Sequence, residues 1–424
     1  MIWCQFVIHI IMSNCVTLEE YNNATGSNIT KAGLWNNPIS WIAIHESSSE
    51  EAMQEISLFL EKMGYKVKTH WVTLINYQKV VDEIVASSDQ SECKPVVLNL
   101  AWGEDLYDGC LGLTFVKALE QSGLPYTGGG SKFYATGNSK FTSKPLFQQY
   151  NVPTAPFVLL HIDSIDEDIT TAEKLFDYPM IVKADKSYSS VLLSNVSVVY
   201  DAQSLKSRAL AIWNNAEGRV LVEKFIEGRE FTVHVAQLFD AESGEPVYRV
   251  YDALERVFVD NEKSTRGKQF FHWDNKLENF VEKHPELNTP SKISSSLLEK
   301  DIYGKNAVDN FEFQLAPKES QAILKEVALN AFKAVGGQSY GRADIRAERP
   351  PTIANNSWKD VNCYVLEMNA HPDVTPLTDS PFSAIFNFLD GQDKGPSAVQ
   401  FLEGIIHTAI YQNRASMKKS FSEL

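Results

Sequence analysis

The sequence has no apolar run long enough to cross a bilayer, no internal repeat and no concentrated basic patch. A membrane-spanning helix needs about 20 consecutive apolar residues, and the apolar start of this chain falls well short of that. Asp and Glu (54) outnumber Lys and Arg (39), and the resulting net charge of -15 repels nucleic-acid phosphates and anionic lipids. We therefore predict that the protein binds neither nucleic acid nor membranes.

The five cysteines are few, scattered and odd in number, and no two are spaced as C-x-x-C. This pattern argues against a disulfide framework and a structural zinc site, and it favours a reducing compartment. The apolar start, MIWCQFVIHIIMSN, lacks the Lys or Arg that ordinarily precedes the apolar part of a secretory signal. We predict a cytoplasmic protein, with an N-terminal signal as the alternative.

The length of 424 residues exceeds what one hydrophobic core usually supports, so two or three domains are expected. Residues 1–37 are polar and turn-rich after their apolar start, and we interpret them as a poorly ordered leader. Residues 38–127 alternate apolar runs (SWIAIHE, YKVKTHWVTL, PVVLNLAW) with helical patterns. This order predicts a small Rossmann-like domain, in which helices cover a parallel sheet.

Two further blocks follow a turn of three glycines at 128–130. Residues 128–222 contain closely spaced β-branched runs, which predict a partly antiparallel sheet. Residues 223–415 begin with strands and end with a helix and the strands SYGRADIRA and NCYVLEMNA. A polar stretch at 260–319 has little periodicity and is interpreted as a surface insertion. The predicted fold class is therefore α/β followed by α+β.

Four polar residues on two late strands form the most informative group. Alternation along a strand places Arg342 and Asp344 on one face, and it does the same for Glu367 and Asn369. If the two strands pair, three oxygen donors and a guanidinium converge, and magnesium prefers such oxygen ligands together with substrate phosphates. The alternative is that these charges are solvated or form ion pairs at strand ends.

A second group suggests a phosphate site. Lys183 ends the apolar run PMIV, where its ammonium is held at a fixed point, and Lys140 belongs to the same group. Ser189 and Ser190 lie in a polar turn whose backbone N–H groups can line an anion site. An ordinary hairpin with an exposed lysine is the alternative.

A third group lies in the segment VLVEKFIEGRE. Its strand ends in Glu223 and Lys224, a turn follows, and Glu230 comes after the turn. This arrangement can present backbone groups to an adenine and carboxylates to a ribose. A hairpin whose charged edges discourage aggregation is the alternative.

In this order, these segments resemble the D-alanine:D-alanine ligase family of the ATP-grasp superfamily, from residue 38 to the C-terminal helix. Any one of the matching motifs could arise by chance, whereas all seven in register are specific. The motifs are G-E-D-x-x-x-G at 103–109, GLPYTGGG at 123–130, NSKFTSK at 138–144, PMIVKADKSYSSV at 179–191, VEKFIEGREFTV at 222–233, YGRADI at 340–345 and LEMNAHPDVTPLT at 366–378.

The resemblance implies a three-domain ATP-grasp architecture and a ligase that activates a carboxylate as an acyl phosphate. It implies that Arg342 stabilises the transferring phosphoryl group and the tetrahedral intermediate, and that the loop of Ser189 and Ser190 closes over the phosphates. The other implied roles are phosphate contacts by Lys140 and Lys183, adenine and ribose contacts by Glu223, Lys224, Ile226 and Glu230, coordination of two Mg²⁺ ions (or Mn²⁺) by Asp344, Glu367 and Asn369, and orientation of the amine by Glu50.

The segments expected to face the substrates depart from the family pattern. The serine pair of the phosphate loop lacks flanking glycines, and the family's serine-proline-glycine is replaced by His371, Pro372 and Asp373. We therefore predict that an amino acid is joined to another amino acid or to a small carboxylate metabolite. The alternatives are a D-alanine:D-alanine ligase proper and a non-catalytic ATP-binding protein, although a scaffold would not need Arg342. The resemblance also implies a homodimer.

Overall fold

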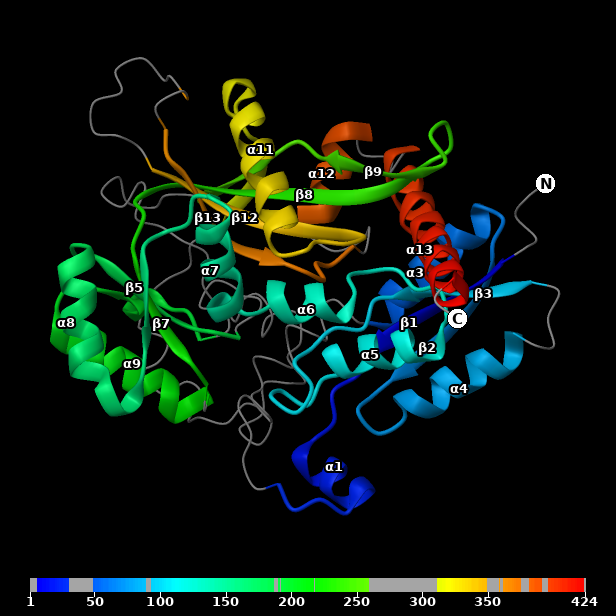
Figure 1. Ribbon diagram of the computed structural model, residues 1–424, viewed down its shortest axis with the longest axis horizontal. Coiled ribbons are helices and arrows are strands. Elements are labelled where there is room, and N and C mark those ends of the chain that lie inside the picture. Colours follow the sequence, from blue (N-terminus) through cyan, green and yellow to red (C-terminus); the bar gives the residue numbers. More distant parts are fainter. Residues whose placement is uncertain are drawn as a thin grey trace.

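The computed structural model contains three β-sheets with helices packed against them (Figure 1). The N-terminal and central sheets lie at opposite ends of the molecule, and the C-terminal sheet lies across both of them (Figure 1). The residues that the structure describes are 6–29, 49–88, 93–186, 190, 192–216, 218–258, 311–348, 358, 361–374, 381–390 and 396–422.

The N-terminal sheet has three parallel strands in the order β2-β1-β3. Apolar side chains alternate between its two faces, so that Ile10 packs on the side of α3 and of the final helix α13 (Pro396–Ser422), and Ile11 packs on the side of α4 and α5. The predicted parallel sheet with helices on both faces is therefore present. Its elements are β1 (Phe6–Ser13), α1 (Leu18–Thr25), α3 (Glu50–Lys62), β2 (Lys66–Val72), α4 (Tyr77–Ser88), β3 (Lys94–Asn99) and α5 (Leu113–Ser122).

The central strand of this sheet, β1, comes from residues that the sequence analysis assigned to a poorly ordered leader. Ile8, Ile10 and Met12 are fully buried in it, between β2 and β3. The following helix α1 is capped by Thr17, whose hydroxyl and backbone amide both contact Glu20 in a capping box. The leader prediction is therefore wrong for residues 6–29, and burial explains the apolar start. The predicted first strand, SWIAIHE, lies outside the described residues.

The central sheet is fully antiparallel, with the strand order β4-β7-β5-β6. Helices α8 and α9 cover its core, which is built around Val182 and Val222 (Figure 1). The antiparallel sheet predicted for this block is confirmed. Its elements are β4 (Phe157–Leu160), α8 (Ile165–Leu175), β5 (Met180–Ala184), β6 (Val198–Val199), α9 (Ala202–Ala216) and β7 (Val220–Lys224).

The C-terminal sheet has the strand order β11-β10-β8-β12-β13, and β9 also pairs with β8. Strand β11 lies within the predicted insertion at 260–319 and pairs with β10, so that prediction is wrong for its last part; residues 259–310 lie outside the described residues. The helix predicted before the strands SYGRADIRA and NCYVLEMNA is present as α11. The elements are β8 (Gly228–Asp240), β9 (Glu245–Val250), β10 (Leu254–Phe258), β11 (Phe311–Leu315), α11 (Lys318–Ala334), β12 (Tyr340–Glu348), β13 (Cys363–Asn369) and α12 (Pro381–Asp390).

The long final helix, α13 (Pro396–Ser422), joins the N-terminal sheet to the C-terminal one. Phe401 packs in the core shared by the two sheets, and the Thr408 hydroxyl donates to the Gln237 carbonyl of β8 at 3.1 Å. A side chain at Gly404 would lie 3.0 Å from Leu238, so this glycine permits close packing of helix on strand. In the described part of the chain, no helix combines the length and apolarity needed to cross a membrane.

A disulfide links Cys15, just after β1, to Cys110. The argument from cysteine spacing against disulfides is therefore wrong for this pair. The two residues are 95 positions apart, so no local spacing reveals that they are neighbours. Cys93 and Cys363 are buried and are not disulfide-bonded.

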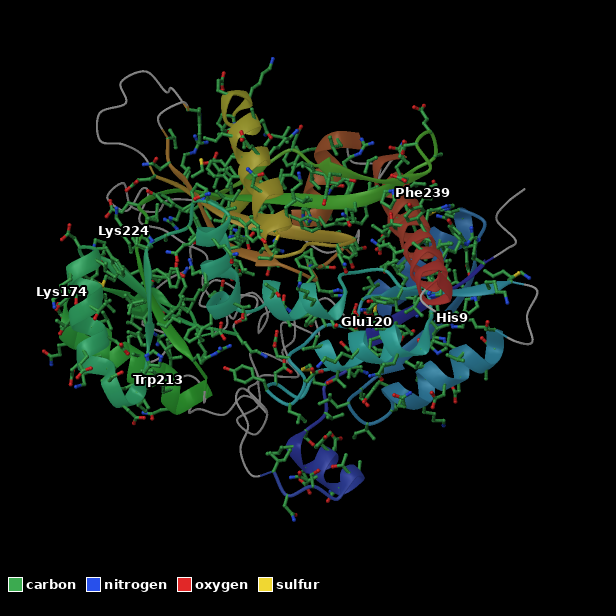
Figure 2. All side chains as sticks on the ribbon, in the orientation of Figure 1. His9, Glu120, Lys174, Trp213, Lys224 and Phe239 are labelled. Atoms are coloured by element: carbon green, nitrogen blue, oxygen red, sulfur yellow. A yellow bond between two sulfur atoms is a disulfide. The ribbon has the colours of Figure 1, made fainter. Side chains whose placement is uncertain are left out.

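Two histidines of adjacent strands form a partly buried pair in the N-terminal sheet. His9 of β1, labelled in Figure 2, is 2% exposed, and its Nδ1 lies 2.9 Å from Nε2 of His70 in β2. Burial, followed by the charges of His70 and Lys68, lowers the pKa of His9 from 6.5 to about 4. The folded protein therefore keeps His9 uncharged at pH values where the unfolded chain protonates it.

Because His9 must stay uncharged in the fold, we expect the free energy of unfolding to fall in mild acid. Since the unfolded state binds the proton more tightly, the stabilisation is complete above pH 6.5 and is lost as the pH falls toward 4. At about 1.4 kcal/mol per pH unit, the wild type should lose about 2 kcal/mol more than a His9→Gln variant between pH 6.5 and pH 5. Urea unfolding at the two pH values measures this difference. Parallel losses in the two proteins would rule it out.

Candidate nucleotide and metal site

One face of the C-terminal sheet carries the predicted metal group. Strand β12 lies between β8 and β13, and its register pairs Arg342 with Asn369 and Asp344 with Glu367. Directly paired residues of antiparallel strands project from the same face. The structure therefore brings these four side chains together. Backbone hydrogen bonds from β12 to β8 and β13 set their positions, so these side chains do not depend on a loop.

Asp344 is the centre of this group. Its two oxygens accept hydrogen bonds from the Arg342 guanidinium at 3.1 Å each. Asn369 Nδ2 donates to Oδ2 at 3.0 Å, and the Thr232 hydroxyl of β8 donates to Oδ1 at 2.9 Å. Burial raises the pKa of Asp344, but the charges of Arg342 and Arg256 and the hydrogen bonds to the carboxylate together outweigh it and hold that pKa below the ordinary value. An ionised carboxylate with orienting partners is thus fixed at this point.

Three buried charges meet on the other side of the site. Glu223, at the end of β7, is 0% exposed, and its two oxygens lie 3.0 Å from Lys183 Nζ of β5 and 3.1 Å from Lys144 Nζ. Lys144 belongs to α7 (Lys140–Gln149) and is itself fully buried. Burial raises the pKa of Glu223, but the two ammonium groups together lower it by more than burial raises it. The carboxyl group therefore stays ionised. The sequence analysis did not single out Lys144.

Lys140 connects the two groups. Its Nζ lies 2.9 Å from Glu367 Oε2, and it donates to the Asp185 carbonyl oxygen at 3.4 Å. Helix α7 starts at this point because the Ser139 hydroxyl caps it and also donates to the Asp185 carboxylate at 2.9 Å. Burial acts to lower the Lys140 pKa, but its ion pair with Glu367 and the charges of Asp185 and Glu223 together raise that pKa above its ordinary value. The ammonium therefore stays charged beside the predicted metal ligands.

Glu230, predicted to bind a ribose, has both carboxylate oxygens in ion pairs. Arg346 Nη1 lies 3.2 Å from one oxygen, and Arg256 of β10 contacts the other. The Arg346 guanidinium also covers the Phe225 ring at 4.9 Å. Neither arginine was among the residues predicted from the sequence. Alternation in the run Arg342-Ala-Asp-Ile-Arg346 places Arg346 on the same face as Arg342 and could have indicated it.

The remaining predicted nucleotide residues lie around the end of β7. Lys224, labelled in Figure 2, forms an ion pair with Glu348 at 3.3 Å and is partly exposed, whereas Ile226 is buried. Ser190 has a left-handed backbone (φ 60°), and its carbonyl accepts a hydrogen bond from the Leu193 amide. Ser189 lies outside the described residues. No contact described here tests the roles predicted for these residues, which stay predictions: Lys224, Ile226, Ser189 and Ser190.

Glu50, predicted to orient the amine, lies in the first turn of α3. Its side chain is exposed and accepts a hydrogen bond from Gln54 at 3.2 Å. The contacts described for Arg342 and Asp344 do not include it. The structure therefore does not bring Glu50 to the metal group, and its role stays a prediction.

The segment of the predicted phosphate loop is tied to the N-terminal domain at its base. Lys186, directly before that loop, forms a 2.9 Å ion pair with Glu104, and Asn138 also contacts Glu104 at 3.4 Å. The Glu104 loop is held by Asp108, whose carboxylate accepts from the Glu104 amide at 3.0 Å. Sequence reasoning found the G-E-D motif but gave Glu104 no role.

The donor set suits a cation that is shared with a phosphate. Within the described residues, no three His, Cys, Asp or Glu side chains gather into a group that could hold a metal alone. The predicted set has two carboxylates and the Asn369 amide, and Mg²⁺ is usually held by one or two carboxylates plus phosphate oxygens. With Lys140 and Lys183 beside it, the arrangement can neutralise a polyphosphate and position it for transfer.

Comparisons with known proteins agree with this geometry. Residues 146–300 match the family model described as the D-ala D-ala ligase C-terminus. The D-alanine–D-alanine ligase of Ralstonia nicotianae is 25% identical over 72% of this chain and 72% of that protein. The ligase of the same name from Cupriavidus necator is 32% identical over 64% of this chain, and the match spans 65% of that protein's length.

A solved structure supports the fold over nearly the whole chain. The D-alanine–D-alanine ligase of Bacillus anthracis, solved in complex with ATP, covers 97% of this chain and 99% of its own, with a TM-score of 0.54 and 16% sequence identity. The predicted ATP-grasp architecture, in which a Rossmann-like N-terminal domain precedes two α+β subdomains, is therefore confirmed as the fold class.

Proposed function

We propose that this chain, a member of the D-alanine–D-alanine ligase-like family of the ATP-grasp superfamily, is an ATP-dependent ligase that joins a carboxylate to an amine and releases ADP. The observation that carries the proposal is the Arg342–Asp344 pair, which lies opposite Asn369 and Glu367 on the neighbouring strand. Glu367 in turn forms an ion pair with Lys140. A binding scaffold needs no guanidinium at such a point, whereas phosphoryl transfer does.

The chemistry follows from what each group can stabilise. A carboxylate becomes reactive toward an amine when the γ-phosphoryl group of ATP makes one of its oxygens a leaving group. Lys140 and Lys183 bind the phosphates as fixed point charges. Arg342 stabilises the charge of the transferring phosphoryl group and then that of the tetrahedral intermediate. The deprotonated amine attacks the acyl carbon and forms the new carbon–nitrogen bond, the carbon–oxygen bond to phosphate breaks, and the nitrogen loses a proton to solvent or to the departing phosphate.

Magnesium is proposed at Asp344, Glu367 and Asn369. These side chains fit the ion because they are hard oxygen donors on adjacent strands, and Thr232 and Arg342 already orient the central carboxylate. When bound, Mg²⁺ neutralises phosphate charge and aligns the γ-phosphoryl group. Glu367 is the proposed ligand shared by two ions, and Mn²⁺ is an alternative metal.

The nucleotide is proposed to lie between the central and C-terminal sheets, with its adenine at the end of β7. Ile226 and Lys224 line the adenine site, and Glu223 and Glu230 approach the base and the ribose. The Glu230 carboxylate is already oriented by Arg346 and Arg256, so ribose hydroxyls would donate to a fixed acceptor. The loop of Ser189 and Ser190 is proposed to close over the phosphates.

The proposed substrates are an amino acid and a second amino acid or small carboxylate metabolite. The departure at His371 and Asp373 supports substrates other than two D-alanines. The names of the relatives favour D-alanine–D-alanine ligation as the second candidate. A homodimer is proposed from the resemblance. The proposed compartment is the cytoplasm, where ATP is supplied; the Cys15–Cys110 disulfide removes the cysteine argument for it.

The test is a product screen. Purified protein with ATP, Mg²⁺, pooled D- and L-amino acids and small carboxylic acids is expected to yield ADP, phosphate and a condensed amide in equal amounts, measured by mass spectrometry. D-alanyl-D-alanine as the main product would establish the second candidate. AMP with pyrophosphate would sink the acyl-phosphate mechanism, and an Arg342→Ala variant must abolish any activity that is assigned to this site.

A further inference from the structure

Lys144 is a fully buried lysine to which the proposed reaction gives no task. It lies one helical turn after Lys140 in α7, so both side chains leave the same face of that helix. The Lys144 side chain is 0% exposed. A lysine is seldom buried to this extent unless its charge is matched by a partner. The contacts of its ammonium group therefore indicate what the charge does in the folded protein.

The surroundings of Lys144 Nζ suit a positive charge. Glu223 Oε1 lies 3.1 Å away, and Nζ donates to the Thr154 hydroxyl oxygen at 2.9 Å. Thr154 donates its own hydrogen to the Val365 carbonyl oxygen of β13 at 2.8 Å, so its oxygen is free to accept from Lys144. Nζ also lies 5.5 Å from the centre of the Phe157 ring, over its face. Burial lowers the pKa of Lys144, and the Glu223 carboxylate opposes that decrease.

Lys144, Lys183 and Glu223 together carry one net positive charge, and we call them the Glu223 cluster. The two ammonium groups lie 3.1 Å and 3.0 Å from the two oxygens of the single carboxylate. Of the two lysines, Lys183 keeps an exposed fraction of 6%, whereas Lys144 has none and is held by Thr154. Buried charges act strongly on one another because little water screens them. Without Lys144, the Glu223 charge would cancel that of Lys183.

We infer that Lys144 is a positioning residue for the nucleotide: its charge balances Glu223 and thereby leaves the charge of Lys183 to attract the phosphates of ATP. This inference rests on the proposed function, because that function assigns Lys183 to the phosphates. Lys144 acts through the other two members of the Glu223 cluster and needs no contact with the nucleotide. The affinity for the phosphates should therefore follow the net charge of the cluster.

The test compares a ligand that carries phosphates with one that carries none. The measured quantity is the Kd of adenosine divided by the Kd of ATP, both from displacement of a fluorescent ATP analogue, without metal ion or carboxylate substrate. Contacts to the base and ribose cancel in this ratio. Lys144→Met makes the Glu223 cluster neutral and is expected to lower the ratio about tenfold. Lys79→Met, which removes an exposed lysine that pairs with Glu83 at 3.9 Å, is the control and should leave the ratio unchanged.

A second substitution separates charge balance from a structural role. Adding Glu223→Gln to Lys144→Met restores one net positive charge to the Glu223 cluster. The ratio of the double variant is therefore expected to return to within about threefold of the wild type. A role of Lys144 in packing alone predicts no such recovery. If Lys144→Met fails to fold, Lys144→Gln keeps a hydrogen-bond donor beside Glu223 and is expected to show the same decrease.

The outcomes distinguish the inference from the function on which it rests. An unchanged ratio in a folded Lys144 variant, or a decrease that the double variant does not reverse, overturns the inference and leaves the proposed ligase in place. Wild-type protein that binds neither ligand, or that binds adenosine as tightly as ATP, overturns the proposed function instead.

Discussion

Replacing Arg342 with alanine is expected to lower kcat about 10³-fold, because the arginine stabilises charge that develops only during phosphoryl transfer. The KM for ATP should change much less, since Lys140 and Lys183 carry the ground-state phosphate contacts in this proposal. Arg342→Lys should recover little activity, because an ammonium cannot reproduce the two hydrogen bonds to Asp344 at 3.1 Å. Steady-state ADP release measures kcat and the KM for ATP of the wild type and of both variants.

The control must separate lost catalysis from lost structure. Arg342→Ala leaves the buried Asp344 without its main cationic partner, so its thermal unfolding has to be measured beside its kinetics. Arg249→Ala removes the same charge from an exposed position of the neighbouring β9 and should retain wild-type activity. A folded Arg342→Ala protein with a kcat within tenfold of the wild type would contradict the assigned role.

Replacing Glu223 with glutamine is expected to destabilise the protein by about 3 kcal/mol, because it leaves two buried ammonium groups without a carboxylate. Lys144 and Lys183 both lie within 3.1 Å of Glu223, and all three side chains are buried. Replacing one partner of a buried ion pair costs more than the pair contributes, since the remaining charges stay desolvated. Urea unfolding of the protein without nucleotide measures the loss.

A partly exposed carboxylate at the end of β12 provides the matched control. Glu348 pairs with Lys224 at 3.3 Å, and both side chains are partly exposed to solvent. Exposed ion pairs contribute about 1 kcal/mol or less, so Glu348→Gln should be nearly neutral. Equal stability changes in the two variants would contradict the view that Glu223 holds a buried charge cluster. Recovery of stability in a Glu223→Gln, Lys144→Met double variant would support it.

The strand alternation in the sequence was enough to group Arg342, Asp344, Glu367 and Asn369. A period of two places these residues on one face, and the apolar run before Glu367 indicates a buried strand. The sequence did not indicate that Glu223 is fully buried between two lysines. At the sequence level, a charged residue at a strand end looks the same whether it faces solvent or another domain.

Other differences arise from contacts between distant segments. Residues 6–13 were assigned to a leader because a turn-rich stretch follows them, yet β1 is the middle strand of its sheet. Cys15 and Cys110 are joined across 95 positions, and the ion pair of Arg256 with Glu230 depends on the pairing of β10 with β8. Propensity and spacing act locally, so they cannot identify partners that only the tertiary fold brings together.

The 2.9 Å ion pair between Lys140 and Glu367 has a consequence for ligand binding. The lysine ammonium is ion-paired with the carboxylate that would coordinate the proposed metal, so the two cations compete for one oxygen. Phosphate offers the ammonium a new partner, which frees Glu367 for the metal. Nucleotide and metal should therefore increase each other's affinity, and thermodynamic linkage requires the two increases to be equal. In this view Lys140 is a counterion that exchanges partners when ATP arrives.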